Sequence, residues 1–357
     1  MRARAELVED RGEAASAGEF FRSRPFLDAE GATHTLRIEL ESAAVKGAEA
    51  VGDSPNASSQ ADGPGDESAD TVLVAPLIVR DFPGTSARDA ISPYGYPGLV
   101  PAPPERGREK PYIVRESSAT PGVDGALEPG EVDWSATGLV SVFLRHRLGP
   151  SPLAGATERN LVQLADPALA PKSRPSDRRQ VRRNLEAGYR VELVPGDETT
   201  PAQRAGFLDV YEQTMRRAAA AEHYFFGAAY FDRVLAAPRT WLALATAPDG
   251  ELAAASIAAA SDGYLHYYLS GTADSRLREA PMKNVVTLLV DHATSLDLPL
   301  NLGGGLRPGD ALEEFKRGFA NRTEPWLTSE LICDPEKYEL LSKGKPPGPF
   351  FPAYRAL

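Results

Sequence analysis

The sequence predicts an α/β protein in which helices flank a mixed, twisted sheet. Three neighbouring segments carry this prediction. Residues 264–269 are an aromatic and aliphatic run that is too short for a stable helix and is typical of a strand. Pro281 then opens a helix, and residues 299–302 form a second short strand that ends in a triple glycine. A strand, a helix and a strand in this order favour a crossover unit with two neighbouring parallel strands.

Length and composition limit the alternatives. The chain has 357 residues, 42% of them hydrophobic, which suffices for two domains or for one domain with a large insertion. No apolar run reaches about 18 residues and the N-terminus is charged, so we expect neither a membrane span nor a secretory signal. The single cysteine, Cys333, excludes an internal disulfide. These features favour a cytoplasmic protein, and the net charge of −11 argues against general nucleic-acid coating.

The first half alternates short strands with long polar segments. Residues 1–18 are expected to be frayed. Strands are expected at 35–41 and 71–80, and the segment 46–70 between them is too poor in apolar residues to order itself. Pro76 indicates an edge or a bulge in the second strand. The other elements expected here are a helix or loop from Phe20 to Leu27, a loop at 101–129, and strands at 139–144 and 161–164.

The loop at residues 81–100 contains several turn-forming Pro and Gly steps. Its two tyrosines, Tyr94 and Tyr96, would lie beside exposed backbone. Either the loop packs on the surface, or the rings line a ligand site, since loops on rigid scaffolds often carry function. Both interpretations stay open at the level of the sequence.

The second half begins with a basic helix. Ser176 is its expected N-cap, Asp177 lies in its first turn, and Gly188 is expected to end it. The other elements expected in this half are a strand at 189–194, helices at 201–221 and 224–235, a hairpin of 240–247 and 251–260, a short helix at 311–319, a strand at 327–332 and a Pro-rich tail from Pro335.

Several segments over most of residues 70–335 resemble one family by their order and spacing. In the first half they are the strand ending LIVR, the loop SPYGYPG and the strand VSVFLRH. In the second half they are RRQVRRNLEAGYRVEL, YEQTMRR, the YFF and AAYF aromatics, YLSG, NLGGG and EEFKRGF. The chain resembles the Fem-type (FemAB-like) aminoacyltransferases, which carry two GNAT-fold domains in tandem.

The resemblance implies a division of the chain into three parts. A first GNAT-like domain would occupy residues 1–170 and carry the long loops at about 46–70 and 101–130. A second, at 171–330, would carry the active site. Residues 331–357 would form a C-terminal strand and tail that pack back on the first domain.

The resemblance also implies a reaction, the formation of an amide bond. The family transfers an aminoacyl group from aminoacyl-tRNA to an amine, here of a cell-wall precursor or a specialised metabolite. In Fem-type enzymes a Phe-Lys pair in the late helix contacts the tRNA end and supports transfer, and Phe315 and Lys316 stand at the matching place. The family's phosphate-binding arginine has no clear match; Arg216, Arg217 or His223 would have to replace it.

The candidate catalytic residues are Lys316 and Phe315. Aminolysis of an ester needs a neutral amine, an oxyanion stabiliser and a route for one proton. Lys316 would stabilise the oxyanion or hold terminal phosphates, and the alternative is a solvated lysine on a short helix. Phe315 would stack on a terminal base, and the alternative is a core anchor.

Further residues are candidates for substrate contact. Asn301, Gly303 and Gly304 end a strand, where the backbone would approach the substrate or simply turn into the next helix. Ser270 lies where the strand from Tyr264 is expected to stop, with free N–H groups at Gly271. Tyr267 and Tyr268 point to opposite faces, so only one meets the cleft, and Tyr268 is our choice.

The strongest basic feature is the arginine cluster of the helix that follows residue 174. At spacings of three and four these side chains share a face and would bind tRNA phosphates, or they form a solvated helix face. The candidates for tRNA binding are Arg178, Arg179, Arg182 and Arg183.

Other chemistries are not expected. Cys333 is more easily explained as an inert thiol than as a nucleophile. The histidines are isolated and no metal-binding spacing occurs, so we expect no metal. No dinucleotide or Walker pattern is present, so we expect no such cofactor.

Two alternatives remain. An acyl-CoA transferase of the same fold would need a Gln/Arg-x-x-Gly-x-Gly/Ala loop before the helix at Pro281, where this chain has GTADSRLREAPM. A non-catalytic double module that only binds a peptide or tRNA is the third possibility.

Overall fold

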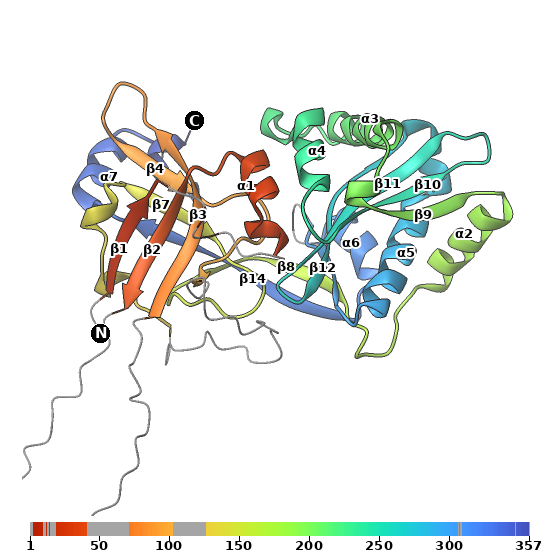
Figure 1. The fold of residues 1–357 in the computed structure, drawn as a ribbon, viewed down its shortest axis with the longest axis horizontal. Helices are drawn as coiled ribbons and strands as arrows, with labels where there is room; N and C mark the ends of the chain where they lie inside the picture. The colour runs from red at the N-terminus through yellow and green to blue at the C-terminus, as the bar shows by residue number, and fades with distance from the viewer. Residues whose placement is uncertain are drawn as a thin grey trace, which may run out of the picture.

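A single mixed sheet runs through the molecule, and helices cover it in two lobes (Figure 1). The computed structural model describes residues 3–9, 12, 14, 19–40, 71–102, 126–305, 307, 309–346 and 348–356. Over these ranges the sheet has 14 strands in the order β6-β1-β2-β3-β4-β7-β14-β8-β13-β12-β11-β10-β9, with β5 beside β3. The predicted α/β class, with helices flanking a mixed sheet, is therefore confirmed.

The first lobe holds the early strands, α1 and the C-terminal segment. Its elements are β1 (Ala3–Val8), α1 (Arg24–Glu30), β2 (His34–Leu40), β3 (Thr71–Asp81), β4 (Arg88–Ile91), β5 (Val100–Pro101), β6 (Val132–Asp133), β7 (Ser141–Arg145) and α7 (Pro335–Ser342).

The second lobe holds most of the helices. Its elements are α2 (Pro175–Glu186), β9 (Arg190–Pro195), α3 (Pro201–Arg217), α4 (Ala228–Leu235), β10 (Thr240–Thr246), β11 (Leu252–Ser261), β12 (Tyr264–Thr272), α5 (Met282–Ser295), β13 (Leu300–Gly303) and α6 (Ala311–Arg317).

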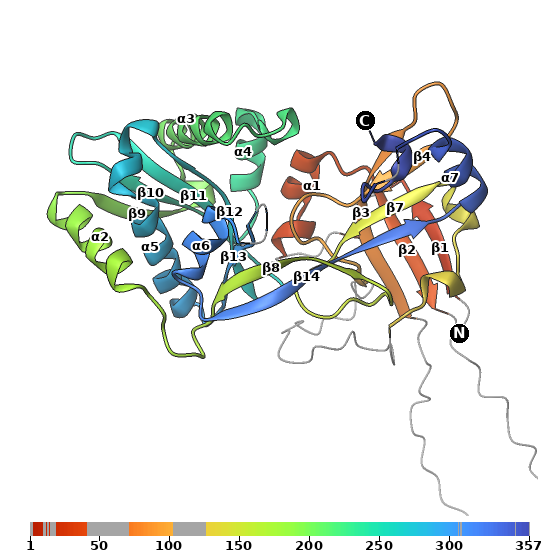
Figure 2. The same ribbon diagram turned by 180° about the vertical axis from the view of Figure 1, so that it is seen from behind.

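Two long strands, β8 (Thr157–Ala165) and β14 (Arg322–Ile332), cross from one lobe to the other, as Figure 2 shows. They pair with each other along most of their length. At one end β14 pairs with β7, and at the other end β8 pairs with β13. The backbone ladder is therefore continuous between the lobes, which restricts how far they can move apart.

The structure corrects several predictions about individual elements. The segment expected to be frayed contains β1, which pairs with β2. The basic helix begins at Pro175 with Arg174 as its N-cap, so Ser176 lies inside the helix and does not cap it. The loop expected at 81–100 contains β4, and the tail contains α7. The expected loop at 46–70 and most of the one at 101–130 lie outside the described residues.

Pro76 is explained by a change of neighbour along β3 rather than by an outer edge or a bulge. On one side, β2 pairs with β3 from Thr71 to Leu77. On the other side, β5 pairs at Leu73 and Val74 and β4 pairs only from Ile78 onward. The carbonyl of Leu77 accepts from the N–H of Thr33 next to β2, so the adjacent Pro76 faces the gap between β5 and β4. A missing N–H is tolerated there.

The predicted crossover unit is present, because β12 and β13 are parallel neighbours joined through α5. The side chains of α5, and of the residue that follows it, are buried to different extents. Leu288 and His292 are only partly buried and Leu296 is 36% exposed. The buried side chains of α5 are Asn284, Val285, Val286, Leu289 and Ala293.

The strand β12 does not stop at Ser270, as the sequence indicated, but pairs with β11 as far as Thr272. Its register shifts between Leu269 and Tyr267, which leaves Tyr268 as an extra, bulged residue. Gly271 has a packing role instead of the predicted free N–H. A Cβ there would lie 2.4 Å from backbone atoms of Val210 and Tyr211, so α3 packs directly on this strand.

A buried ion pair ties the N-terminal segment to the second lobe. Arg22, in a 3-10 turn before α1, donates to both carboxylate oxygens of Asp262 in the β11–β12 turn at 2.6 and 3.1 Å. The two side chains are only 4% and 9% exposed. Burial alone would raise the pKa of Asp262, but the charge and hydrogen bonds of Arg22 lower it overall. Arg22 also donates to the carbonyl of Pro97 at 2.7 Å, which fixes the SPYGYPG loop.

We expect Asp262→Asn to lower the free energy of unfolding by about 3–5 kcal/mol, because it leaves the Arg22 guanidinium buried without its counter-charge. Urea denaturation measures this. The matched control is Glu212→Gln, which removes the exposed i,i+4 pair with Arg216 and should change stability by less than about 0.5 kcal/mol. Equal effects of the two substitutions would contradict a structural role for the buried pair.

Candidate active site

The strands β12 and β13 separate after a short stretch of pairing near the start of each strand. They pair only at Leu265 with Leu300 and at His266 with Asn301. Beyond these residues β12 stays with β11, whereas Gly303 of β13 pairs with Gln163 of β8. Ligands of α/β sheets bind outside the carboxyl ends of strands where neighbouring strands diverge. This divergence, called the strand split below, is the centre of the candidate site.

Lys316 of α6 reaches the end of β13. Asp310 caps this helix by accepting from the N–H of Glu313, and Lys316 lies on the buried side with an exposure of 7%. Its ammonium donates to the carbonyl of Gly304 at 2.6 Å. Burial lowers the pKa of Lys316 from 10.5 to about 8, and the charge of Asp310 acts against this change. The lysine is thus a desolvated cation that donates a hydrogen bond to the backbone, not a solvated side chain.

The triple glycine permits this close approach. Gly303 has a φ of +74°, and a Cβ there would lie 3.2 Å from the Lys316 ammonium. A Cβ on Gly304 would lie 2.2 Å from the side-chain nitrogen of Asn160, which itself donates to the carbonyl of Gly305 at 2.8 Å. Side chains at these positions would displace Lys316 or Asn160.

Asn301 connects this loop to the first lobe. It is 1% exposed, and its carbonyl oxygen accepts from the N–H of Gly303 at 2.8 Å. Its amide nitrogen therefore donates to Nδ1 of His266 at 3.0 Å, and Nε2 of His266 donates to the carbonyl of Ser261. Burial lowers the pKa of His266 to about 4, so the ring is neutral. Tyr96 hydrogen-bonds to Asn301, and burial raises the pKa of Tyr96 to about 12.

Tyr94 and Tyr268 lie in a second cluster, on the same face of β12 as His266, because the ring of Phe21 contacts both His266 and Tyr268 with centroids 4.9 and 5.8 Å apart. The hydroxyl of Tyr268 contacts that of Tyr230 at 2.7 Å, and the hydroxyl of Tyr230 donates to the carboxylate of Glu30 at 2.6 Å. The same carboxylate accepts from the backbone N–H of Tyr94 at 2.8 Å. Burial raises the pKa of Glu30, while the hydrogen bonds and the charge of Arg145 act in the other direction.

Glu30 and Tyr230 were not among the candidates from the sequence. Glu30 lies at the end of a short helix, and Tyr230 belongs to an aromatic run that predicts only core. They are 200 residues apart in the chain, so no local spacing indicates their contact. The only signal was Tyr94, whose loop the sequence did mark as unusual.

The structure brings some of the predicted residues together and leaves others apart. Lys316, Gly303, Gly304, Asn301 and Tyr96 form one connected group through the contacts above. Phe315 packs instead against the apolar core beneath α5, with its ring 5.6 Å from that of Phe319. Ser270 accepts from the hydroxyl of Tyr267 at 2.6 Å and is not part of the group around Lys316.

The four arginines of α2 are all exposed. Contacts on the other side of α2, away from these arginines, hold the helix next to the candidate site. Arg174 at its N-cap pairs with Glu314 of α6, and the buried Asp177 pairs with Lys283 of α5 at 2.8 Å. Asn184 donates to Asn284 at 2.7 Å and to the carbonyl of Glu279 at 2.9 Å. The basic surface is therefore fixed next to the helix of Lys316.

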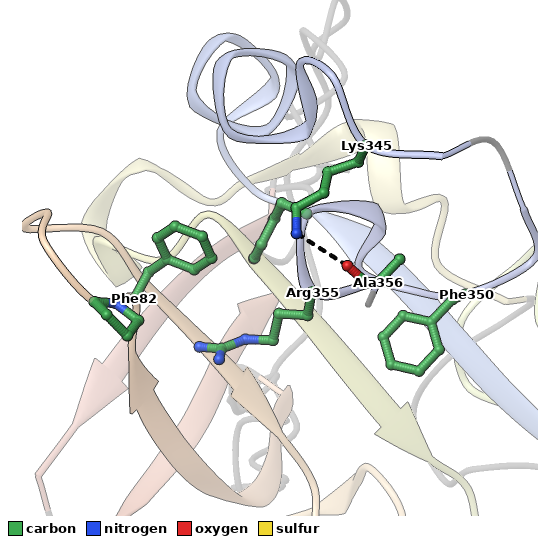
Figure 3. Close-up of a pocket in the computed structure, with 7 residues that line it drawn as sticks. Phe82, Lys345, Phe350, Arg355 and Ala356 are labelled. Atoms are coloured by element: carbon green, nitrogen blue, oxygen red, sulfur yellow. Dashed lines mark hydrogen bonds between the residues drawn. The ribbon is translucent and has the colours of Figure 1, made fainter.

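A cavity of about 800 Å³ lies elsewhere, between the β3–β4 turn and the C-terminal segment of the first lobe (Figure 3). Phe82, Phe350 and Tyr354 contribute apolar surface. Both of its cations are occupied: Lys345 donates to the carbonyl of Ala356 at 2.9 Å, and Arg355 pairs with Asp89 at 2.5 Å. None of the predicted site residues lines it, so we do not assign it to the candidate site.

Other features add no reactive group. Burial raises the pKa of the Cys333 thiol to about 12, so it stays protonated. Over the described residues, no three His, Cys, Asp or Glu side chains gather in a way that would hold a metal ion. The described helices are also too short or too polar to cross a lipid bilayer.

Comparison with known proteins supports a GNAT-type fold. Residues 171–317 match the family described as an acetyltransferase (GNAT) domain. The chain is similar to the crystal structure of FemX with a TM-score of 0.56 and 10% identity, over 94% of this chain and 99% of FemX. The C-terminal domain of a putative lysylphosphatidylglycerol synthetase from Agrobacterium fabrum gives a TM-score of only 0.46 at 13% identity, over 75% and 82% of the two chains, which supports no conclusion. Comparison with curated protein sequences gives no match.

The predicted resemblance to Fem-like proteins of GNAT fold is thereby confirmed at the level of the fold. At 10% identity the likeness says nothing about the substrates. The roles of the individual residues stay predictions.

The burial of Lys316 predicts a dependence of stability on pH. Its pKa is about 8 in the folded chain against 10.5 for an ordinary lysine, so the unfolded chain binds more protons between these values. Stability due to this group therefore rises with pH across this window, by about 3 kcal/mol. We expect the wild type to gain that much relative to Lys316→Met between pH 8 and 10.5, measured by urea denaturation. A constant difference would contradict the buried position, and Lys337→Met, at an exposed lysine, is the control.

Proposed function

We propose that this chain, whose residues 171–317 match a GNAT domain, is an N-acyltransferase that forms an amide bond. The donor would be an aminoacyl-tRNA, and the acceptor an amine of a cell-wall precursor or of a specialised metabolite. The observation that carries this proposal is the desolvated ammonium of Lys316 at the strand split, 2.6 Å from the carbonyl of Gly304.

The proposed reaction is the aminolysis of the ester at the end of the tRNA. The lone pair of the neutral amine attacks the ester carbonyl, the C–N bond forms, and the C–O bond to the ribose breaks. One proton passes from the amine to the departing ribose oxygen. No covalent enzyme intermediate is needed, which agrees with a protonated Cys333 thiol.

The charge of Lys316 would stabilise a neighbouring oxyanion more strongly here than it would in water. An ammonium in a water-poor site stabilises the oxyanion that develops on the carbonyl, because the low local dielectric strengthens the interaction. With a pKa of about 8 it also lies close to the pH at which a proton donor is most effective. Gly303 and Gly304 permit the close approach of Lys316 to the end of β13, and Phe315 would then position α6 through its core contact, or stack on the terminal base.

The donor side of the proposal rests on charge. The chain as a whole carries −11, yet Arg178, Arg179, Arg182 and Arg183 are exposed on a helix held next to α6. A local basic surface on an acidic protein would orient a polyanion towards the strand split. This supports tRNA as the donor.

The acceptor side would involve the tyrosine cluster around Glu30. Tyr94 is 36% exposed, and with Tyr96 and Tyr268 it would line the approach from the first lobe. The Glu30 carboxylate, held by Tyr230, would attract an acceptor ammonium and accept its proton, because its raised pKa makes it a better base than an ordinary glutamate. Ser270 and Asn301 would add polar contacts.

The main rival is an acyl-CoA donor, which the description of the matched family as an acetyltransferase domain favours. The segment before α5, where a coenzyme A phosphate would be held, argues against it. Of its two cations, Arg276 is bound to Asp249 and Glu251, whereas Arg278 is exposed; the nearby Lys283 is bound to Asp177. Calorimetric titration with coenzyme A that shows micromolar binding would reverse the preference.

We expect Lys316→Met to lower kcat at least ~100-fold while leaving the fold intact, because it removes a single oxyanion donor. The assay follows the aminoacyl group from charged tRNA to an amine acceptor. Arg317→Met, the next residue of the same helix but exposed, is the matched control and should act within ~3-fold of wild type. An unchanged rate for Lys316→Met would favour the non-catalytic binding module.

Deprotonation of the Lys316 ammonium should also lower kcat at alkaline pH. Because burial lowers the pKa of Lys316 to about 8, the protonated form and the activity that needs it should decline above that pH. The kcat of the wild type measured from pH 6 to 10 tests this. A profile that keeps rising to pH 10 would exclude the ammonium as the active form.

The tRNA donor has its own test. Transfer should stop when ribonuclease is added before the acceptor, and it should persist unchanged if the acyl group comes from another carrier. Gel-shift titration with uncharged tRNA should show weaker binding of Arg179→Glu/Arg183→Glu. Transfer that survives ribonuclease would remove the tRNA claim but leave the acyltransferase claim standing.

A further inference from the structure

A cavity of about 530 Å³ lies between α2, α5 and the segment 165–173, away from the strand split. Its volume is within the range of small-molecule sites, roughly 300–1,000 Å³. Both helices are fixed by contacts outside the cavity: α5 packs on the sheet, and α2 is held by the contacts of Asp177 and Asn184. The cavity is therefore fixed by rigid elements, and its lining does not depend on a loose surface loop.

The interior of this cavity is mostly apolar. Val181 and Leu185 line it from α2, Val290 from α5, and Leu169 and Phe319 from the adjoining segments. Leu169 is 46% exposed and Leu185 is 48% exposed, although both sit at the same opening. Covering apolar surface contributes about 25 cal/mol per Å². An apolar occupant would thus remove unfavourable surface from water.

The opening carries an excess of positive charge. Lys172, Arg178 and Arg182 line it, and across the described residues none of the three forms an ion pair with a carboxylate. Within the part of the chain that the structure describes, the guanidinium of Arg178 donates only to the carbonyl of Ser173.

The two acids of the lining offset little of this charge. Asp166 pairs with Arg322 at 3.2 Å and accepts from the N–H of Ala168 at 3.0 Å, so its charge is already compensated. Asp291 remains, and burial raises its pKa. Three cations therefore face one acid, Asp291, which forms no ion pair with any residue that the structure describes.

From this geometry we propose that the cavity binds a small amphipathic anion, a carboxylate or phosphate head joined to an apolar body. The head would pair with Arg178 and Arg182, which lie one turn apart on α2, and the body would contact Val181, Leu185 and Val290. A nucleic-acid strand is a poorer occupant, since exposed leucines give its phosphates nothing to bind. Arg179 and Arg183 do not line the cavity and stay available for such a contact. This inference does not depend on the proposed transferase activity.

Isothermal titration with decanoate, decanol and inorganic phosphate tests the proposal, because the first has both parts and the others have one each. We expect decanoate to bind at least ~10-fold more tightly than decanol or phosphate, which corresponds to one or two favourable charge contacts. Comparable affinities for decanoate and decanol, or no heat up to millimolar decanoate, would overturn it.

Variants on a single helix provide the matched control. Arg178→Ala/Arg182→Ala should weaken decanoate binding about 10-fold, whereas Arg179→Ala/Arg183→Ala should leave it within about 2-fold. Leu185→Glu places a negative charge at the opening, and since this side chain is half exposed the fold should tolerate it. Circular dichroism checks folding. Equal effects of the two arginine pairs, or displacement of decanoate by a short RNA with equal dependence on all four, would contradict a site in the cavity.

Discussion

The contact between Arg22 and Asp262 is the constraint on which the relation of the two lobes depends. A guanidinium and a carboxylate removed from water are tolerated only together, and here they join residues 240 positions apart. The same guanidinium holds the carbonyl of Pro97, so one charge fixes both the N-terminal segment and the SPYGYPG loop. Phe21 then packs against Tyr96 and His266, with ring centroids 5.5 and 4.9 Å away.

This junction determines what surrounds the strand split. Tyr96 of the first lobe can reach Asn301 because the SPYGYPG loop is fixed. Asn301 in turn orients Gly303, because its side-chain oxygen accepts from the N–H of Gly303. The glycines leave room for Lys316, whose charge stays buried with the carbonyl of Gly304 as its hydrogen-bond acceptor. A lowered pKa follows from this arrangement of backbone and does not require a neighbouring positive charge. The candidate chemistry is thus a consequence of close packing around a lysine at the end of β13.

The helix α2 serves two surfaces at once. Its inward side contributes Asp177 and Asn184 to a polar network with α5, so the helix stays in place although little of it is apolar. Its outward side is divided, because Arg178 and Arg182 border the cavity and Arg179 and Arg183 do not. A cluster that looks like one basic face in the sequence therefore separates into two pairs with different surroundings.

The sequence by itself determined the α/β class, the parallel crossover around α5 and most strands. These follow from local periodicity, turn residues and short-range spacing, which act within about ten to twenty residues. It misjudged β1, which pairs with β2, and the end of β12, where pairing with β11 overrides the local preference. It also misplaced the N-cap of α2, because Pro175 opens this helix. The Glu30–Tyr230 contact, the burial of Lys316 and the division of the arginines were decided only by the tertiary structure. Burial and long-range contact depend on which surfaces meet after folding, and no local pattern encodes them.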